Sequence, residues 1–542
     1  MGSECLPFTQ IPHSTRLFSD FLYNHPRVQQ FYARVPDLKQ WAENEAGQIG
    51  YDDARRQRVA VILERQNQSW GAGPETKTNL ARFRKGAACV VTGQQVGLFG
   101  GPLFAIFKAL SAVRMSAEAT ASGVDCVPIF WLATEDHDLA EVNHTDLLGP
   151  EGTLHSLKTS SHDVLDAPLN KIPLASDIRE LVAQAAEVLG ESEITEILRQ
   201  AYRPGVTLGD AFARLFTNLL SRWGVIMLDA ADPELHTLAR PIYSAAAEHA
   251  VALDDALLRR GQELTKAGYH EQVKVTPLST LLFTVRNGAR VVIHRGGGVT
   301  SGANGNGFRV GQEKISSAEL LKRIAERPQD FSANVLLRPV VQDFLLPTLA
   351  YVAGPAEIAY FAQAAVVYEK LLQRITPVLP RFSATLVEPK PRELMERYRV
   401  GLRDLLHGLE EVQQLLATRV LPPELQAAFD SAEKTLERSV NTIREALRKL
   451  DPTLVDAAQR AASKMNYQLE QLRARAARAE LRRKEILARH ALQLSNSLYP
   501  RKELQEREIG GVSFLGRHGL ELLERLYQAT GAACPDHQII YL

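Results

Sequence analysis

Residues 87–102 read AACVVTGQQVGLFGGP, and this stretch sets the expectation for the whole fold. The apolar run Ala87–Val91 predicts a buried strand. The loop Thr92–Gly101 follows it, and Pro102 then opens a helical pattern over Leu103–Ala119, where the missing proline N–H costs nothing. A strand that passes through a short loop into an amphipathic helix is typical of the start of a βαβ unit.

The same alternation continues through residues 1–389. Further strand-like apolar runs lie at Cys126–Ala133, Gly224–Asp229, Leu281–Arg286, Arg290–Arg295 and Leu349–Val352. Helical patterns occupy Leu208–Arg222, Pro233–Leu258 and Ala356–Leu372. Strands that alternate with helices predict an α/β protein with a parallel, doubly wound sheet. Two insertions are expected in this core, at about 150–205 and 296–330; the second opens with GGGVTSGANGNG, which favours a mobile surface turn over a phosphate loop.

From residue 390 to about 498 the strand signals stop. A heptad-like apolar seam runs along Leu425, Phe429, Ala432, Leu436, Val440, Ile443, Leu447 and Leu450. A second helix is predicted over Leu454–Leu494 and a third over Arg392–Arg419, with prolines between them. The pattern predicts an antiparallel helical coiled coil over 390–498, which would dimerise with a second copy, and a C-terminal segment over 499–542 that returns to the core.

Composition narrows the class of protein. The chain has 542 residues, 45% hydrophobic and 23% charged, so it can bury a large core. Its 63 basic and 63 acidic residues cancel, which disfavours nucleic acid as the main partner. The most apolar stretch, Leu345–Tyr368, contains prolines and polar residues and predicts a buried strand and helix, so no membrane segment is expected.

Cysteine use and the N-terminus favour a cytoplasmic location. Four widely spaced cysteines form neither a CxxC pair nor a zinc motif: Cys5, Cys89, Cys126 and Cys534. Cys89 and Cys126 lie in apolar runs, so buried inert thiols are expected there. The first ten residues lack the basic and apolar regions of a signal peptide.

The loop Thr92–Gly101 is the first candidate binding site. A strand that leads into a helix N-terminus presents backbone N–H groups and a dipole that favour an anion. The candidates for nucleotide or substrate binding are Thr92, Gly93, Gln94, Gln95, Gly97, Gly100 and Gly101. A purely structural strand-to-helix turn is the alternative, because the loop matches neither a Walker A nor a GxGxxG pattern.

An acidic run, Glu135-Asp136-His137-Asp138, is the second candidate. It follows the apolar run Pro128–Ala133, at the carboxyl end of a strand where open α/β sheets bind ligands. Crowded carboxylates beside a histidine can bind an amine and move a proton, so Asp136, His137 and Asp138 are the catalytic candidates, with Glu135, Asn143 and His144 as binding residues. An exposed acidic loop and a metal site remain alternatives.

Charges embedded in apolar sequence form the third candidate. Asn334, Arg338, Asp343 and Glu357 lie within residues 334–357, and Arg338 can hold a carboxylate or phosphate bidentately. An internal ion pair of Arg338 with Asp343 or Glu357 is the alternative. A basic stretch in the predicted arm offers a second nucleotide contact through Arg478, Arg482 and Arg483, or simply a solvated helix face.

Five stretches carry a family resemblance: PHSTRLFSDFLYNHPRVQQFY (12–32), TGQQVGLFGGPLFAIFKALSA (92–112), PIFWLATEDHDLAEVNH (128–144), NVLLRPVVQDFLLPTLAYVAGPAEIAYFAQ (334–363) and LYPRKELQERE (498–508). Together they resemble BshC, the cysteine ligase family of bacillithiol biosynthesis. The resemblance implies a Rossmann-like core, a C-terminal coiled coil that mediates dimerisation, and ligation of L-cysteine to the amine of glucosaminyl malate. In that family nucleotide is associated with the coiled coil as well as with a Rossmann-type site.

Amide formation in water needs an activated carboxylate and a deprotonated amine. ATP or ADP is therefore the expected nucleotide, Mg²⁺ is a candidate cofactor, and no zinc or other resident metal site is expected. The alternative functions are a metal-dependent hydrolase or nucleotidyltransferase on the same core, and a coiled-coil assembly or RNA-binding protein. All of the ligase interpretation requires that the loop at Gln94 and the acidic run at His137 share one pocket.

Overall fold

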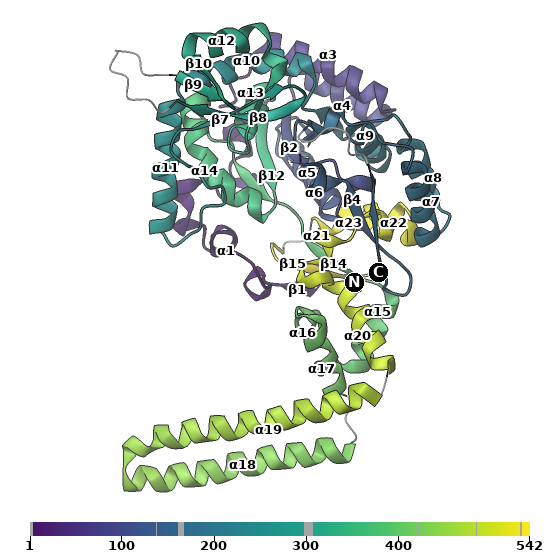
Figure 1. Cartoon of the computed structure of the whole chain (residues 1–542), viewed down its shortest axis with the longest axis vertical. Coiled ribbons are helices and arrows are strands. Elements are labelled where there is room, and N and C mark those ends of the chain that lie inside the picture. The colour runs from purple at the N-terminus through teal and green to yellow at the C-terminus, as the bar shows by residue number, and fades with distance from the viewer. Residues whose placement is uncertain are drawn as a thin grey trace.

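The computed structural model describes residues 4–136, 138–160, 167–296, 307–419, 423–483, 485–531 and 534–542. A main body contains the sheets, and a long helical hairpin projects from it (Figure 1). The hairpin consists of α18 (Pro423–Leu450) and α19 (Val455–Arg483). The predicted combination of an α/β core and a coiled-coil arm is confirmed.

A five-stranded parallel sheet forms the centre of the core. Its strands, in spatial order, are β13 (Val378–Pro380), β12 (Thr348–Ala353), β2 (Ala88–Gln94), β3 (Cys126–Leu132) and β6 (Ile226–Asp229). The chain lays β2, β3 and β6 in one direction and then places β12 and β13 on the other side of β2. The strand order therefore reverses between β2 and β12, the position where doubly wound sheets bind ligands.

Helices cover both faces of this sheet. Alternate strand residues such as Val91 and Ile129 enter one apolar core, and their neighbours Phe130 and Leu132 enter another. α5 (Phe104–Ala121) packs against β2 and β3, while α3 (Asp53–Ser69) and α4 (Pro74–Lys85) pack against β6 and β3. Burial on both faces explains why the strands are continuous apolar runs.

Two predicted strands belong to a different sheet. β7 (Ser279–Arg286) and β8 (Ala289–Arg295) form an antiparallel hairpin, joined by Asn287 and Gly288, which both have positive φ. This two-residue turn matches the twist of a hairpin and excludes a helical crossover. The hairpin belongs to a five-stranded sheet with β9 (Gly307–Val310), β10 (Glu313–Ser316) and β11 (Phe331–Ala333). Of the predicted glycine-rich turn, residues 297–306 lie outside the described part of the chain.

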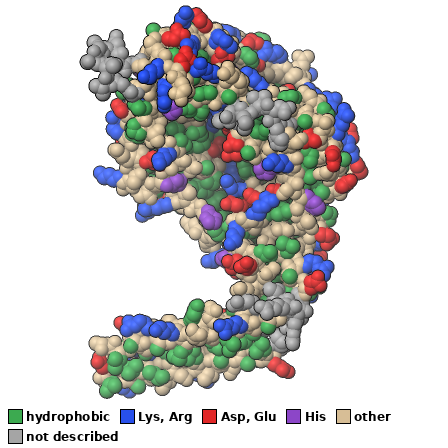
Figure 2. All heavy atoms as spheres, in the orientation of Figure 1, with side chains coloured by type: hydrophobic (Ala, Val, Ile, Leu, Met, Phe, Trp, Pro, Cys, Tyr) green, Lys and Arg blue, Asp and Glu red, His purple; other side chains and the backbone are tan. Residues whose placement is uncertain are grey.

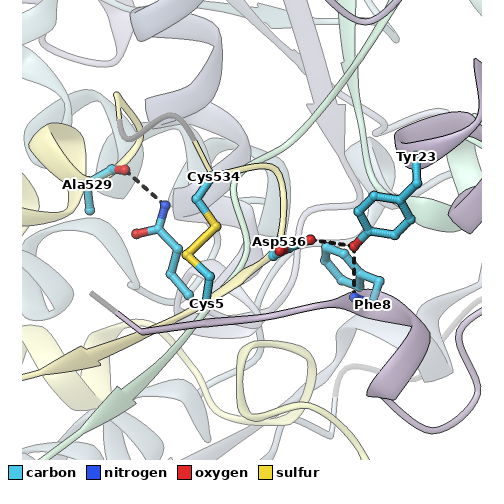
Figure 3. The surroundings of a disulfide bond; sticks show 7 residues. Cys5, Phe8, Tyr23, Ala529, Cys534 and Asp536 are labelled. Atoms are coloured by element: carbon cyan, nitrogen blue, oxygen red, sulfur yellow. Dashed lines mark hydrogen bonds between the residues drawn. A yellow bond between two sulfur atoms is a disulfide. The ribbon is translucent and has the colours of Figure 1, made fainter. Parts of the chain in front are cut away.

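The two ends of the chain meet in a third sheet. β1 (Glu4–Leu6), β15 (His537–Tyr541) and β14 (Ala384–Val387) lie side by side. A disulfide joins Cys5 to Cys534, and the Tyr23 hydroxyl nearby donates to Asp536 at 2.5 Å (Figure 3). The two cysteines are 529 residues apart, so their spacing in the sequence did not predict this pair. The other two thiols, Cys89 and Cys126, are free and buried as predicted, and burial raises the pKa of Cys126 to about 12.

The arm departs from its prediction in two details. The expected helix over Arg392–Arg419 breaks into α15 (Pro389–Tyr398), α16 (Leu402–Leu405) and α17 (Leu409–Arg419). The break follows from Arg399, which has a left-handed conformation, and from Gly401. The expected helix over Leu454–Leu494 comprises α19 and α20 (Glu485–Leu498), with residue 484 undescribed. No helix among the described residues is long and apolar enough to cross a membrane.

Candidate active site

A cavity of about 550 Å³ opens at the carboxyl ends of β2, β3 and β12. Gln94 and Gln95 reach it from the end of β2, and Glu135 and Asp136 reach it from the loop after β3. Asn334 reaches it from the turn after β11, Arg338 from the start of α13 (Arg338–Leu345), and Glu357 from α14 (Pro355–Leu372). Residues from all three predicted groups therefore share one pocket, at the point where the strand order reverses.

A buried ion pair forms part of the cavity wall. Lys108 of α5 is 2% exposed, and its Nζ lies 2.6 Å from Glu357 Oε2. The same ammonium donates to the Gly93 carbonyl and to Gln94 Oε1. Burial lowers the pKa of Lys108, and Glu357 offsets part of this effect. Burial alone would raise the pKa of Glu357, but Lys108 and the Gly354 N–H outweigh it and lower that pKa.

Any residue with a Cβ atom at position 93 would require the neighbouring strand to move. A Cβ atom placed there would lie 2.8 Å from the carbonyl oxygen of Trp131. The Trp131 indole lines the cavity beside it, and its buried Nε1 has no hydrogen-bond partner within the described residues.

Asp136 is bound to the protein on two sides. Its carboxylate accepts from Gln95 Nε2 at 2.8 Å and lies 3.5 Å from Arg290 Nη1 of β8. Gln95 also donates to Glu141 at 2.8 Å, so one amide joins the glycine loop to the acidic loop. This contact directly links the two segments that the ligase interpretation requires to be neighbours.

Glu135 has a different partner. Its Oε1 lies 3.1 Å from Nε2 of His236, a buried residue of α10 (Pro233–Glu248). Burial raises the pKa of Glu135, and the His236, Arg290 and Arg338 charges lower it only in part. A carboxyl group with a raised pKa in a cavity is a candidate for proton transfer.

Arg338 faces the cavity with neutral partners. Its guanidinium donates to Tyr360 Oη at 2.5 Å and to Gln342 Oε1 at 3.4 Å. Asp343 instead accepts from Gln342 and from Tyr368, and Glu357 pairs with Lys108. Within the described part of the chain no carboxylate lies within ion-pair distance of Arg338. The alternative of an internal ion pair with Asp343 or Glu357 is therefore wrong.

Four residues of the glycine loop lie away from the cavity wall. Thr92 donates its hydroxyl to the Val352 carbonyl of β12, and the Gly100 N–H donates to Tyr202 Oη. Gly97 and Gly101 pack against each other within the turn. The C-terminal segment covers the start of α5, where the Leu103 N–H donates to the Ile509 carbonyl. One donor of this helix N-terminus, the Leu103 N–H, is therefore taken by a peptide segment distant in sequence.

Other predicted residues also lie outside the wall. Asp138 and His144 are exposed, at the starts of α6 (Leu139–Val142) and β4 (His144–Leu148). Asn143 is buried nearby, and Asp343 is held by Gln342 and Tyr368. The catalytic candidate His137 and the side chains of Arg478, Arg482 and Arg483 lie outside the described residues.

The sequence analysis missed several wall residues. These are Lys108, Arg290, Arg381 and Arg507, and behind the wall His236. Arg381 pairs with the fully buried Glu506 at 2.5 Å, and Glu506 and Arg507 belong to α21 (Gln505–Glu508). Lys108 and α21 lie in two of the stretches that carry the family resemblance, which was an available signal. His236 and Arg290 lie in none of them.

No group of three or more His, Cys, Asp and Glu side chains suited to a metal ion occurs among the residues that the structure describes. Mg²⁺ bound together with a nucleotide phosphate stays a prediction, because such an ion takes few protein ligands.

Two family models match the chain. Residues 1–382 match "Bacillithiol biosynthesis BshC, N-terminal Rossmann-like domain", and residues 384–542 match "Bacillithiol biosynthesis BshC, C-terminal coiled-coil domain". Curated relatives from Koribacter versatilis and Solibacter usitatus are 48% and 36% identical over 100% of both chains. One from Salinibacter ruber is 31% identical over 97% of this chain and 96% of its own. All three are named "Putative cysteine ligase BshC", which supports the ligase interpretation and not the hydrolase, nucleotidyltransferase or RNA-binding alternatives.

Proposed function

This chain belongs to the BshC family of bacillithiol biosynthesis, and we propose that its cavity joins the carboxylate of L-cysteine to the amine of glucosaminyl malate. One observation carries the proposal. The cavity at the sheet's reversal point holds Arg338, which lacks an acidic partner among the described residues, together with the acidic pair Glu135 and Asp136. Such a cavity complements a substrate that has carboxylates at one end and an amine at the other.

Arg338 is proposed to bind the malate carboxylates. Its guanidinium is hydrogen-bonded to neutral groups and forms no ion pair among the described residues, and its planar fork suits a carboxylate. Asp136 and Glu135 would attract the ammonium group of the sugar. Gly93, Gln94 and Gln95 supply further polar contacts beside them.

The cysteine carboxylate needs activation before an amine can displace its oxygen. We assign this to ATP as a co-substrate, which supplies a phosphoryl or adenylyl group to the carboxylate. The amine nitrogen then forms a bond to the carboxyl carbon, and the C–O bond to the phosphate breaks with its electron pair on the departing oxygen. Arg507 lines the same cavity and its guanidinium suits a phosphate, whereas Arg381 in that wall is already paired with Glu506. Holding both reactants in one cavity would supply several kcal/mol, roughly 7–11 for ideal positioning.

The test is a direct ligation assay. Purified protein receives glucosaminyl malate and cysteine, with ATP or without nucleotide, and mass spectrometry follows the amide product together with AMP or ADP. Amide that forms only with ATP supports the proposal. If the amide forms equally well without nucleotide, ATP is not a co-substrate. If no amide forms under either condition, the ligase assignment is refuted.

We also propose that the arm makes the protein a homodimer. Within a single chain the hairpin leaves part of its apolar seam open to solvent, including Ile443 at 53% and Leu450 at 78% exposed on α18. Leu454 just before α19 and Met465 and Leu472 on α19 are also exposed, and Figure 2 shows hydrophobic side chains along the arm. A contiguous apolar face on a coiled coil is a normal partner surface for a second helix pair. Light scattering should give a dimer for the native chain and a monomer for Ile443→Glu; a monomeric native chain at micromolar concentration would refute the proposal.

We propose a cytoplasmic location for the reaction, because it consumes L-cysteine and a nucleotide. The Cys5–Cys534 disulfide is then a link that a reducing thiol pool can open, since cytosolic disulfides are rarely permanent. Fractionation of the producing cells, followed by thiol trapping of the two cysteines, tests both statements. Recovery of the protein outside the cytoplasm would refute the location.

A further inference from the structure

Glu135 and His236 form a buried pair that links the cavity to the protein interior. Glu135 lies in the cavity wall, and its Oε1 is 3.1 Å from Nε2 of His236. The other ring nitrogen, Nδ1, lies 2.8 Å from the Phe331 carbonyl oxygen and 3.3 Å from Tyr243 Oη. His236 is 5% exposed, so it reaches the cavity only through Glu135.

The hydrogen-bond partners define how many protons the pair holds. A carbonyl oxygen can only accept, so Nδ1 carries a proton and donates it to Phe331. The contact between Nε2 and Glu135 then requires one further proton. That proton sits either on Nε2, as an imidazolium beside a carboxylate, or on Glu135, as a carboxylic acid beside a neutral ring. In the first arrangement Oε1 accepts from His236, which leaves Oε2 as the oxygen that can take up a further proton.

We propose that Glu135 takes the proton that the sugar ammonium must lose before its nitrogen can attack, and that His236 is the positioning residue that keeps Glu135 ionised. The N–H bond of the ammonium breaks, its electron pair stays on nitrogen, and the proton moves to Oε2 of Glu135. This inference rests on the proposed ligation, because it assigns the base for that reaction.

The surroundings favour Glu135 over Asp136 as the base. Both carboxylate oxygens of Asp136 already have partners, because Oδ2 accepts from Gln95 and Oδ1 lies 3.5 Å from Arg290 Nη1. Charged and titratable groups around Glu135 come from four elements: His236 and Tyr243 on α10, Arg290 on β8, Arg338 on α13, and Asp136 next in the chain. Burial nevertheless raises the pKa of Glu135, which brings a carboxylate toward the range useful to a general base.

The first test compares two nucleophiles at saturating concentration. Glu135→Gln should lower kcat for glucosaminyl malate by about 10²- to 10⁴-fold, and the acidic limb of its kcat–pH profile should disappear. Hydroxylamine is uncharged at neutral pH and needs no base, so the variant should form cysteine hydroxamate at a rate within about threefold of the native rate. Equal losses with both nucleophiles would overturn the assignment, since they would indicate a structural or binding role.

A matched variant controls for the loss of a buried carboxylate. Glu45 is 2% exposed and pairs with Arg34 and Arg374 away from the cavity. Glu45→Gln should lower thermal stability and leave the shape of the kcat–pH profile unchanged. If Glu45→Gln abolished the acidic limb as well, the effect would not belong to Glu135.

A second variant tests the role of His236. In His236→Gln the imidazolium is absent, burial of Glu135 is less opposed, and its ionised form requires a higher pH. The acidic limb of the kcat–pH profile should therefore move to higher pH by about one unit, a tenfold loss at a fixed acidic pH. An unmoved limb would refute the positioning role. Native protein that forms no amide at all would instead refute the proposed function, so the two failures are distinguishable.

Discussion

Replacing Lys108 with methionine removes one half of the buried ion pair in the cavity wall while keeping a side chain of similar length. The ammonium contributes a 2.6 Å contact to Glu357 and hydrogen bonds to the Gly93 carbonyl and Gln94 Oε1, so all three N–H groups have partners. Lys108→Met leaves Glu357, which is 18% exposed, as a carboxylate without its cation. Loss of one partner of a buried pair costs about 3–5 kcal/mol of the free energy of unfolding.

The sign of the pH dependence follows from Glu357. In the native protein its pKa is lowered, so it contributes stability above its unfolded pKa and loses that contribution as the pH falls. In Lys108→Met the burial of Glu357 is no longer outweighed by the ammonium, so its folded pKa rises. The penalty is then largest at high pH and shrinks as Glu357 takes up a proton. We expect the loss of stability near about pH 8 to exceed the loss near about pH 5.

Urea unfolding followed by tryptophan fluorescence measures both effects, because Trp131 lies in the same wall. The midpoint should fall with an unchanged slope. The double variant Lys108→Met/Glu357→Gln removes the charge that was left unpaired and should recover part of the loss. An unchanged midpoint at about pH 8, or a loss that grows as the pH falls, would refute the reasoning.

Three further predictions follow from the same contacts. Arg338→Met should raise the KM for glucosaminyl malate about 10- to 100-fold, because the lost hydrogen bonds are to its carboxylates. The KM for glucosamine without malate should not change to the same extent. Steady-state kinetics with the two substrates measure this. Gly93→Ala should lower the free energy of unfolding by about 1–3 kcal/mol, because its Cβ would lie 2.8 Å from a carbonyl oxygen. Gly50→Ala is the control, since a Cβ there meets nothing within 4 Å. Calorimetry of the two variants measures the difference. Cys5→Ser/Cys534→Ser should lower the free energy of unfolding by about 2–4 kcal/mol under oxidising conditions, and dithiothreitol should lower it no further. If dithiothreitol lowered the melting temperature of the native protein and of the double variant equally, the disulfide would not be the cause.

Local patterns predicted most of the strands and helices and the edge of the sheet where the cavity opens. The runs at 87–91 and 126–133 became β2 and β3, and the polar residues after them, Gln95 and Asp136, meet at 2.8 Å. The strand pattern alone predicted β7 and β8 as members of the parallel sheet, whereas their turn at Asn287 and Gly288 makes them an antiparallel hairpin in a second sheet. That signal was present in the sequence, since two successive residues that tolerate positive φ favour a hairpin.

The set of side chains that surround the cavity could not be predicted in the same way. His236, Arg290 and Arg507 come from a helix, an antiparallel sheet and the C-terminal segment, and nothing in their spacing relates them to Glu135 or Arg338. Likewise the sequence did not predict that the Ile509 carbonyl accepts from the Leu103 N–H at the start of α5.

By itself, then, the amino-acid sequence determined the class of fold, the coiled-coil arm and two of the three strand ends that border the cavity, because periodicity and turn chemistry act between residues close in the chain. Only the tertiary structure decided which charges are neutralised and which stay available. Lys108 pairs with Glu357, Arg381 pairs with Glu506, and Arg338 is left with neutral partners. Ion pairing depends on distances of a few ångströms between segments hundreds of residues apart, and packing alone sets those distances.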